Sequence, residues 1–167
     1  MPSIDLIELA LAQPMDWKQF EGMTYELLAG DDLPRLRRLG GYGDHGLDAI
    51  EEAFYQSEAI LETAVQITAQ KAQELKVKDT LTKLQRYKIV PKTIVFLFKD
   101  ECSAGTRRNI QKQCGDLGMH ADIRDRSYIV QQLGLPASKV FARYLGGDIG
   151  GQVQVLLGKA DPLLISQ

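Results

Sequence analysis

An aspartate and a glutamine stand where two predicted strands would bring them together. Asp48 follows the glycine-rich stretch LGGYGDHG of residues 39–46 and begins a predicted strand over Leu47–Phe54. Gln66 lies in a second predicted strand, Thr63–Ala69, on the same face as Thr68, because side chains alternate along a strand. Paired strands lie about 4.8 Å apart. If these two strands pair, a carboxylate and a carboxamide converge on one point.

Such a pair of oxygen donors suits a hard divalent cation. Mg²⁺ keeps several waters and is usually held by one or two carboxylates together with substrate phosphate. The metal would polarise a scissile phosphate and acidify a bound water, and a nearby lysine would stabilise the developing negative charge. We therefore expect Asp48 and Gln66 to bind Mg²⁺ or Mn²⁺.

The elements that must position these residues alternate between helices and strands. A first helix begins after Asp16 and ends near Gly30, with Trp17, Phe20, Met23, Leu27 and Leu28 on its apolar side. A helix over Gln70–Tyr87 places Val77, Leu81 and Leu84 on one face. The further expected elements are strands at residues 36–39, 92–99 and 119–125 and helices at residues 103–118, 126–134 and 137–146. This alternation predicts an α/β sandwich with a mixed sheet.

The order of the motifs resembles the PD-(D/E)XK restriction-endonuclease-like superfamily, most closely its Mrr-like branch. In that branch a helix with FE and LL precedes a loop of the pattern G-x-G-D-x-G-x-D and a strand carrying Q-x-K. The matching stretches here are FEGMTYELL, GYGDHGLD and VQIT, and the resemblance covers residues 16–130, including the buried run TIVFLF. It implies a restriction-endonuclease-like sandwich, in which helices flank a central mixed β-sheet.

The resemblance also implies roles for individual residues. Asp48 matches the metal-binding aspartate, Gln66 the strand glutamate or glutamine, and Glu21 the helix glutamate that often completes the site. The sequence departs from the pattern at Thr68, where the family has a lysine. Lysines migrate to an adjacent helix within the superfamily, and Lys71 is the substitute that this sequence offers.

Composition limits the class of protein. The chain has 167 residues, 44% of them hydrophobic, which suits one globular domain at residues 1–147 followed by a glycine-containing tail or linker at residues 148–167. It has neither an apolar run of 18 residues nor the basic start of a signal peptide, so we expect a cytoplasmic protein that does not enter a membrane. Cys102 and Cys114 have no CxxC or histidine neighbours and are expected to be reduced thiols.

Charge is distributed unevenly along the chain. The net charge is −2, but residues 71–112 carry 11 basic and 4 acidic side chains. Lys71, Lys76, Lys78 and Lys83 lie in this basic segment, largely off the apolar line of their helix. They are candidate contacts to nucleic-acid phosphates, and the alternative is an ordinary solvated helix face.

Three functions follow from these observations. The leading one is a Mg²⁺-dependent DNA endonuclease, the effector domain of a restriction or anti-phage defence protein. The second is a catalytically inactive module of the same fold that binds nucleic acid or mediates oligomerisation, which Thr68 favours. The third is a protein–protein adaptor. A homodimer or larger assembly, and further domains after residue 167, are left open.

Overall fold

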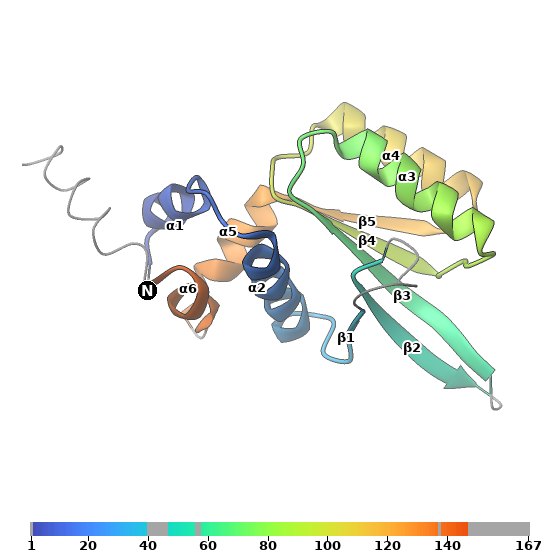
Figure 1. Cartoon of the computed structure of the whole chain (residues 1–167), viewed down its shortest axis with the longest axis horizontal. Helices are drawn as coiled ribbons and strands as arrows, with labels where there is room; N and C mark the ends of the chain where they lie inside the picture. Colours follow the sequence, from blue (N-terminus) through green and yellow to red (C-terminus); the bar gives the residue numbers. More distant parts are fainter. Residues whose placement is uncertain (1, 40–46, 56–57, 137, 147–167) are drawn as a thin grey trace, which may run out of the picture. The chain divides into compact units, whose positions relative to one another are not determined.

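The computed structural model describes residues 2–39, 47–55, 58–136 and 138–146. The chain divides into two compact units. One combines the two ends of the chain, up to Met23 and from Val130 onward, and the other is Thr24–Ile129. The elements, in order, are α1 (Ile4–Leu11), α2 (Trp17–Gly30), β1 (Arg37–Arg38), β2 (Ala49–Tyr55), β3 (Glu58–Thr68), α3 (Gln73–Arg86), β4 (Thr93–Phe98), α4 (Ala104–Asp116), β5 (His120–Arg124), α5 (Arg126–Leu133) and α6 (Val140–Tyr144) (Figure 1).

A five-stranded mixed sheet forms the centre of the second unit. Its strands follow the order β1-β2-β3-β4-β5. The pairs β1–β2 and β2–β3 are antiparallel, whereas β3–β4 and β4–β5 are parallel. Helices α3 and α4 form the two parallel crossovers and lie side by side on one face of the sheet (Figure 1). The predicted α/β fold with a mixed sheet is therefore confirmed.

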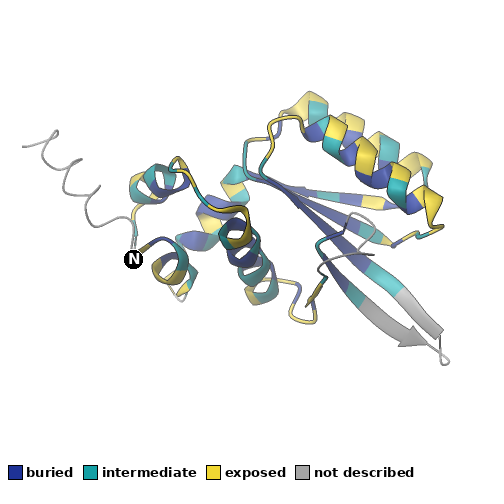
Figure 2. Ribbon diagram, viewed as in Figure 1, coloured by how far each residue is buried: buried dark blue, intermediate teal, exposed yellow. Residues whose placement is uncertain are grey.

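The main core lies between this face and the two helices. Val77, Leu81 and Leu84 of α3 are buried there, as the helical spacing predicts, together with Ile110 and Cys114 of α4. The sheet contributes side chains from its three parallel strands: Ala64, Ile94, Phe96, Phe98, Ala121 and Ile123. On β4, Val95 and Leu97 alternate with Ile94, Phe96 and Phe98 and are also buried. The strand is buried along most of its length (Figure 2). The run TIVFLF is thus buried on both faces, as expected of a parallel strand.

The sequence sets both ends of α4. The Ser103 hydroxyl oxygen accepts a hydrogen bond from the Thr106 amide at 3.2 Å and caps the helix. At the other end the Met119 amide donates to the Cys114 carbonyl at 2.9 Å. Gly118 has a φ of +80°, a backbone conformation that a side chain would strain. The predicted cap and stop of this helix are confirmed.

A buried arginine joins distant parts of the second unit. Arg124, at the end of β5, is 9% exposed and donates to the carboxylates of Asp32 and Asp122. Its guanidinium lies 5.0 Å from the centre of the Tyr128 ring, and the Tyr128 hydroxyl donates to Asp31 at 3.0 Å. The segment that follows α2 is thereby fixed to β5 and to the start of α5.

Two features of the first unit differ from the expectations. Helix α1 was not predicted, although Ser3 caps it by accepting from the Leu6 amide at 3.2 Å. The prediction that Trp17 belongs to the buried side of α2 is wrong, because its side chain is 42% exposed whereas Phe20 and Met23 are buried. Trp17 is the first residue of α2, so the helix has no preceding turn on which its side chain could pack.

None of the described helices is long and apolar enough to cross a membrane. The predicted tail at residues 148–167 lies outside the described residues. Cys102 and Cys114 are both buried, and burial raises the pKa of the Cys114 thiol to about 11.

Candidate metal site and basic helices

Asp48 directly precedes β2, and its backbone bonds to Val65 of β3 and to Leu39. Its amide donates to the Val65 carbonyl at 2.8 Å, and its own carbonyl accepts from the Leu39 amide at 2.8 Å. Its side-chain oxygen Oδ2 accepts from the Ile67 amide at 2.6 Å. The carboxylate therefore satisfies the backbone donor of Ile67, which lies on β3 two residues after Val65, the partner of the first residue of β2. A hydrogen bond to an ionised acceptor is stronger than one between neutral groups.

Asp48 lies beside Gln66 on the neighbouring strand. The β2–β3 ladder ends with the pair Ala49 and Val65, and the Asp48 amide donates to the same Val65 carbonyl. The Asp48 carboxylate accepts from the Ile67 amide, so Asp48 is bonded to the residues on either side of Gln66. Gln66 projects to the face covered by α3 and α4, because Ala64, two residues before it, is part of the core beneath them. The predicted pairing of the two strands is confirmed.

Gln66 carries a buried oxygen that lacks a hydrogen-bond donor. Its side chain is 1% exposed, and Nε2 donates to the Ile67 carbonyl at 2.8 Å. This bond fixes the orientation of the carboxamide, so that Oε1 must point elsewhere. Oε1 has no hydrogen-bond partner among the described residues. An unsatisfied buried acceptor costs about 1–3 kcal/mol, and a cation or a water would remove that cost.

The two side chains together fit a sparse magnesium site. Asp48 supplies an anionic oxygen and Gln66 a neutral one, which are donor types that Mg²⁺ accepts. No group of three or more His, Cys, Asp or Glu side chains that could hold a metal occurs within the described part of the chain. Asp44 and His45 of the glycine-rich loop lie outside that part.

Thr68 occupies the position where the resembling family has a lysine. Its side chain is 2% exposed, and its hydroxyl oxygen accepts from the Gln70 amide at 3.3 Å. This hydrogen bond closes the turn by which the chain leaves β3. Lys71 follows in the exposed segment between β3 and α3. A role for Lys71 at Gln66 stays a prediction.

Glu21 belongs to the unit formed by the two chain ends, whereas Asp48 and Gln66 belong to the other unit. It lies in the first half of α2 and is half-buried. Its participation in the metal site stays a prediction.

The predicted cations of α3 do not share one helix face. Each residue turns a helix by about 100°. Relative to the buried line of Val77, Leu81 and Leu84, this turn places Lys76 and Lys83 on one flank of α3 and Lys78 on the other. Lys83 also forms an ion pair with Asp79, with Nζ and Oδ2 3.4 Å apart. The basic segment thus provides two separate cationic flanks.

The sequence matches no model of a known protein family and no curated protein. The resemblance to the PD-(D/E)XK superfamily therefore depends on the sequence motifs alone and stays a prediction.

Proposed function

We propose that this chain is a divalent-metal-dependent nuclease of the PD-(D/E)XK, Mrr-like type, acting on DNA as the effector domain of a restriction or anti-phage defence protein. One observation carries the proposal: Asp48 is bonded to Val65 and Ile67, the residues on either side of Gln66, and the buried Oε1 of Gln66 has no hydrogen-bond donor among the described residues. The order of the elements also supports a restriction-endonuclease-like fold. Helix α2 precedes the antiparallel β2–β3 pair, and a crossover through α3 leads to the parallel strand β4.

In this proposal each residue has a defined task. Asp48 and Gln66 hold a Mg²⁺ or Mn²⁺ ion, which when bound polarises the scissile phosphate and acidifies a water. Lys71 stabilises negative charge on the phosphate with a long side chain that is not fixed by packing.

The decisive assay is plasmid cleavage with Mg²⁺ or Mn²⁺. Asp48→Asn is the most informative variant, because an asparagine oxygen can still accept from the Ile67 amide while the negative charge is lost. We expect it to lower the rate by at least about a hundredfold, which corresponds to about 2.7 kcal/mol. Asp5→Asn, at an exposed position of α1, is the matched control and should cut like the unchanged protein. Equal cutting by both variants would remove the assignment.

A second function is favoured by the environment of Thr68. Position 68 supplies no cation, and its hydroxyl is used in the turn after β3. A module of the same fold that binds nucleic acid without cutting it needs no cation at this position. The same preparation separates the two functions: salt-sensitive DNA binding without cleavage, and without stabilisation by either metal, would establish the inactive module.

A further inference from the structure

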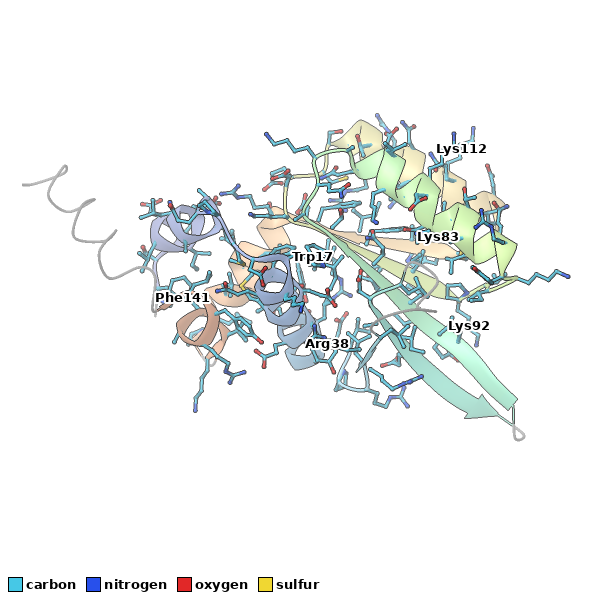
Figure 3. The ribbon with its side chains drawn as sticks, viewed as in Figure 1. Trp17, Arg38, Lys83, Lys92, Lys112 and Phe141 are labelled. Carbon is cyan, nitrogen blue, oxygen red and sulfur yellow. The ribbon has the colours of Figure 1, made fainter. Side chains whose placement is uncertain are left out.

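The outward face of α4 has an unusual composition. Gly105, Arg108, Lys112 and Gly115 recur every three or four residues and lie opposite the buried Ile110 and Cys114. We call these four residues the α4 basic stripe. All four are exposed. Lys112 extends from α4 away from the sheet (Figure 3).

The two cations of the stripe are not used within the described structure. Arg108 and Lys112 form no ion pair with any described residue. Their neighbour Arg107 is different, because it donates to the Ile123 carbonyl at 2.8 Å and pairs with Asp125. Like charges four residues apart destabilise a helix by a few tenths of a kcal/mol. Folding therefore gains nothing from placing Arg108 and Lys112 on one line.

The glycines of the stripe are also not required by packing. A Cβ atom at Gly105 or Gly115 would meet nothing within 4 Å. Glycine inside a helix costs about 1 kcal/mol relative to alanine. Both positions therefore lower helix stability without an internal benefit. At Gly105 and Gly115 no side chain covers the helix backbone beside the two cations.

Lys78 of α3 extends this surface. The Asn109 amide nitrogen Nδ2 donates to Glu74 Oε1 at 3.1 Å, so the Glu74 flank of α3 faces α4. Lys78 is one helical turn after Glu74 on the same flank, and its side chain is exposed. The Glu74 carboxylate is engaged by Asn109. Asp116, the last residue of α4, is the acidic side chain adjacent to the stripe.

We propose that the α4 basic stripe and Lys78 bind the phosphate backbone of duplex DNA, independently of metal and of base sequence. The inference rests on the proposed function, and it adds a second contact that holds the substrate without taking part in the chemistry. Cations placed against phosphates release condensed counterions, which makes the affinity depend steeply on salt. Glycines beside them let the backbone approach the helix closely. Lys83 is left out of this surface, because it lies on the other flank of α3 and pairs with Asp79 (Figure 3).

The test measures binding of a fluorescent duplex in EDTA over a series of salt concentrations. The variant Lys78→Gln/Arg108→Gln/Lys112→Gln removes the three cations. The control Lys18→Gln/Arg35→Gln/Lys139→Gln removes three exposed cations elsewhere and changes the net charge equally. We expect the first variant to reduce the slope of log K against log salt by about 2–3 and the affinity at 0.1 M salt by at least about tenfold. The control should bind nearly as the unchanged protein does.

Equal binding by the two triple variants would overturn the inference. Cleavage measured on the same proteins separates this result from a failure of the proposed function. If the unchanged protein cuts DNA while the two variants bind equally, DNA binding by the α4 basic stripe is wrong and the proposed nuclease function stands. If the stripe variant alone loses binding and no preparation cuts with Mg²⁺ or Mn²⁺, DNA binding by the stripe stands and the proposed nuclease function is wrong.

Discussion

Arg124 donates to both carboxylate oxygens of Asp32, with each nitrogen–oxygen distance 2.7 Å. The two residues are 92 positions apart in the chain, and Asp122 adds a second carboxylate 2.8 Å from Nη2. A planar guanidinium matches a carboxylate in this forked geometry, which a lysine cannot reproduce. The ion pair therefore fixes the segment after α2 to the edge strand β5.

Removal of this arginine should destabilise the protein strongly. Arg124→Leu leaves Asp31, Asp32 and Asp122 clustered without their common cation. We expect the free energy of unfolding to fall by about 2–4 kcal/mol, as measured by urea denaturation. Arg108→Leu, which removes an exposed and unpaired arginine, should change it by less than about 0.5 kcal/mol. Similar losses from the two substitutions would contradict the structural role of Arg124.

The same ion pair predicts a dependence of stability on pH. The hydrogen bond from Arg124 lowers the pKa of Asp32 below its ordinary value of 3.8, against a smaller opposing effect of burial. Because the pKa is lower in the folded state, the contribution to stability is present above pH 3.8 and is lost as the pH falls through the folded pKa. Urea unfolding between pH 6 and the acid limit should show a smaller decline for Asp32→Asn than for the unchanged protein. If the free energy of unfolding declined equally with falling pH in both proteins, Asp32 would not contribute to the pH dependence of stability.

Gln66→Glu should make stability depend on metal. A buried carboxylate at this position loses the donation to the Ile67 carbonyl and adds an uncompensated charge. We expect the metal-free variant to be less stable by about 1–3 kcal/mol. Mn²⁺ should restore most of this loss, because a second carboxylate strengthens binding of the ion. Thermal unfolding with and without Mn²⁺ is the measurement. A melting temperature that Mn²⁺ leaves unchanged would place the metal elsewhere or nowhere in this chain.

Two glycines near the end of α4 should respond in opposite directions to alanine. Gly115→Ala should raise the free energy of unfolding by about 0.5–1 kcal/mol, because the position is helical and open. Gly118→Ala should lower it by about 1 kcal/mol or more, because the φ of +80° suits glycine. Chemical denaturation of both variants checks the pair. An increase for Gly118→Ala would mean that the helix ends differently.

The sequence predicted most of the parallel half of the fold because local patterns determine it. Val77, Leu81 and Leu84 have the spacing of a buried helix face, and the run from Thr93 to Phe98 is apolar enough for a strand buried on both sides. Helix α1 has the same kind of signal in Ile7, Ala10 and Leu11, but it is only eight residues long. A window of eleven or more residues dilutes so short a pattern.

Interactions between distant segments were not predictable from such patterns. Nothing around Asp32 or Arg124 in the sequence indicates their ion pair, because its geometry depends on where α2 ends relative to β5. The division of the α3 lysines between two flanks follows from helical geometry alone, and counting charges along the chain concealed it. The pairing of the strands that carry Asp48 and Gln66 was predictable from their patterns, and binding of a metal by these two residues stays a prediction.

The hydrogen bond from the Ile67 amide gives Asp48 a structural role in addition to the proposed metal binding. Its carboxylate anchors the central strand whether or not an ion is present, so selection for folding alone would preserve it. If the proposed nuclease function holds, a descendant that had lost the ability to cut would be expected to keep Asp48 after Gln66 and Lys71 had changed. Among relatives of this chain, substitutions at positions 66 and 71 would then indicate loss of the proposed catalysis better than conservation of position 48 would indicate its presence.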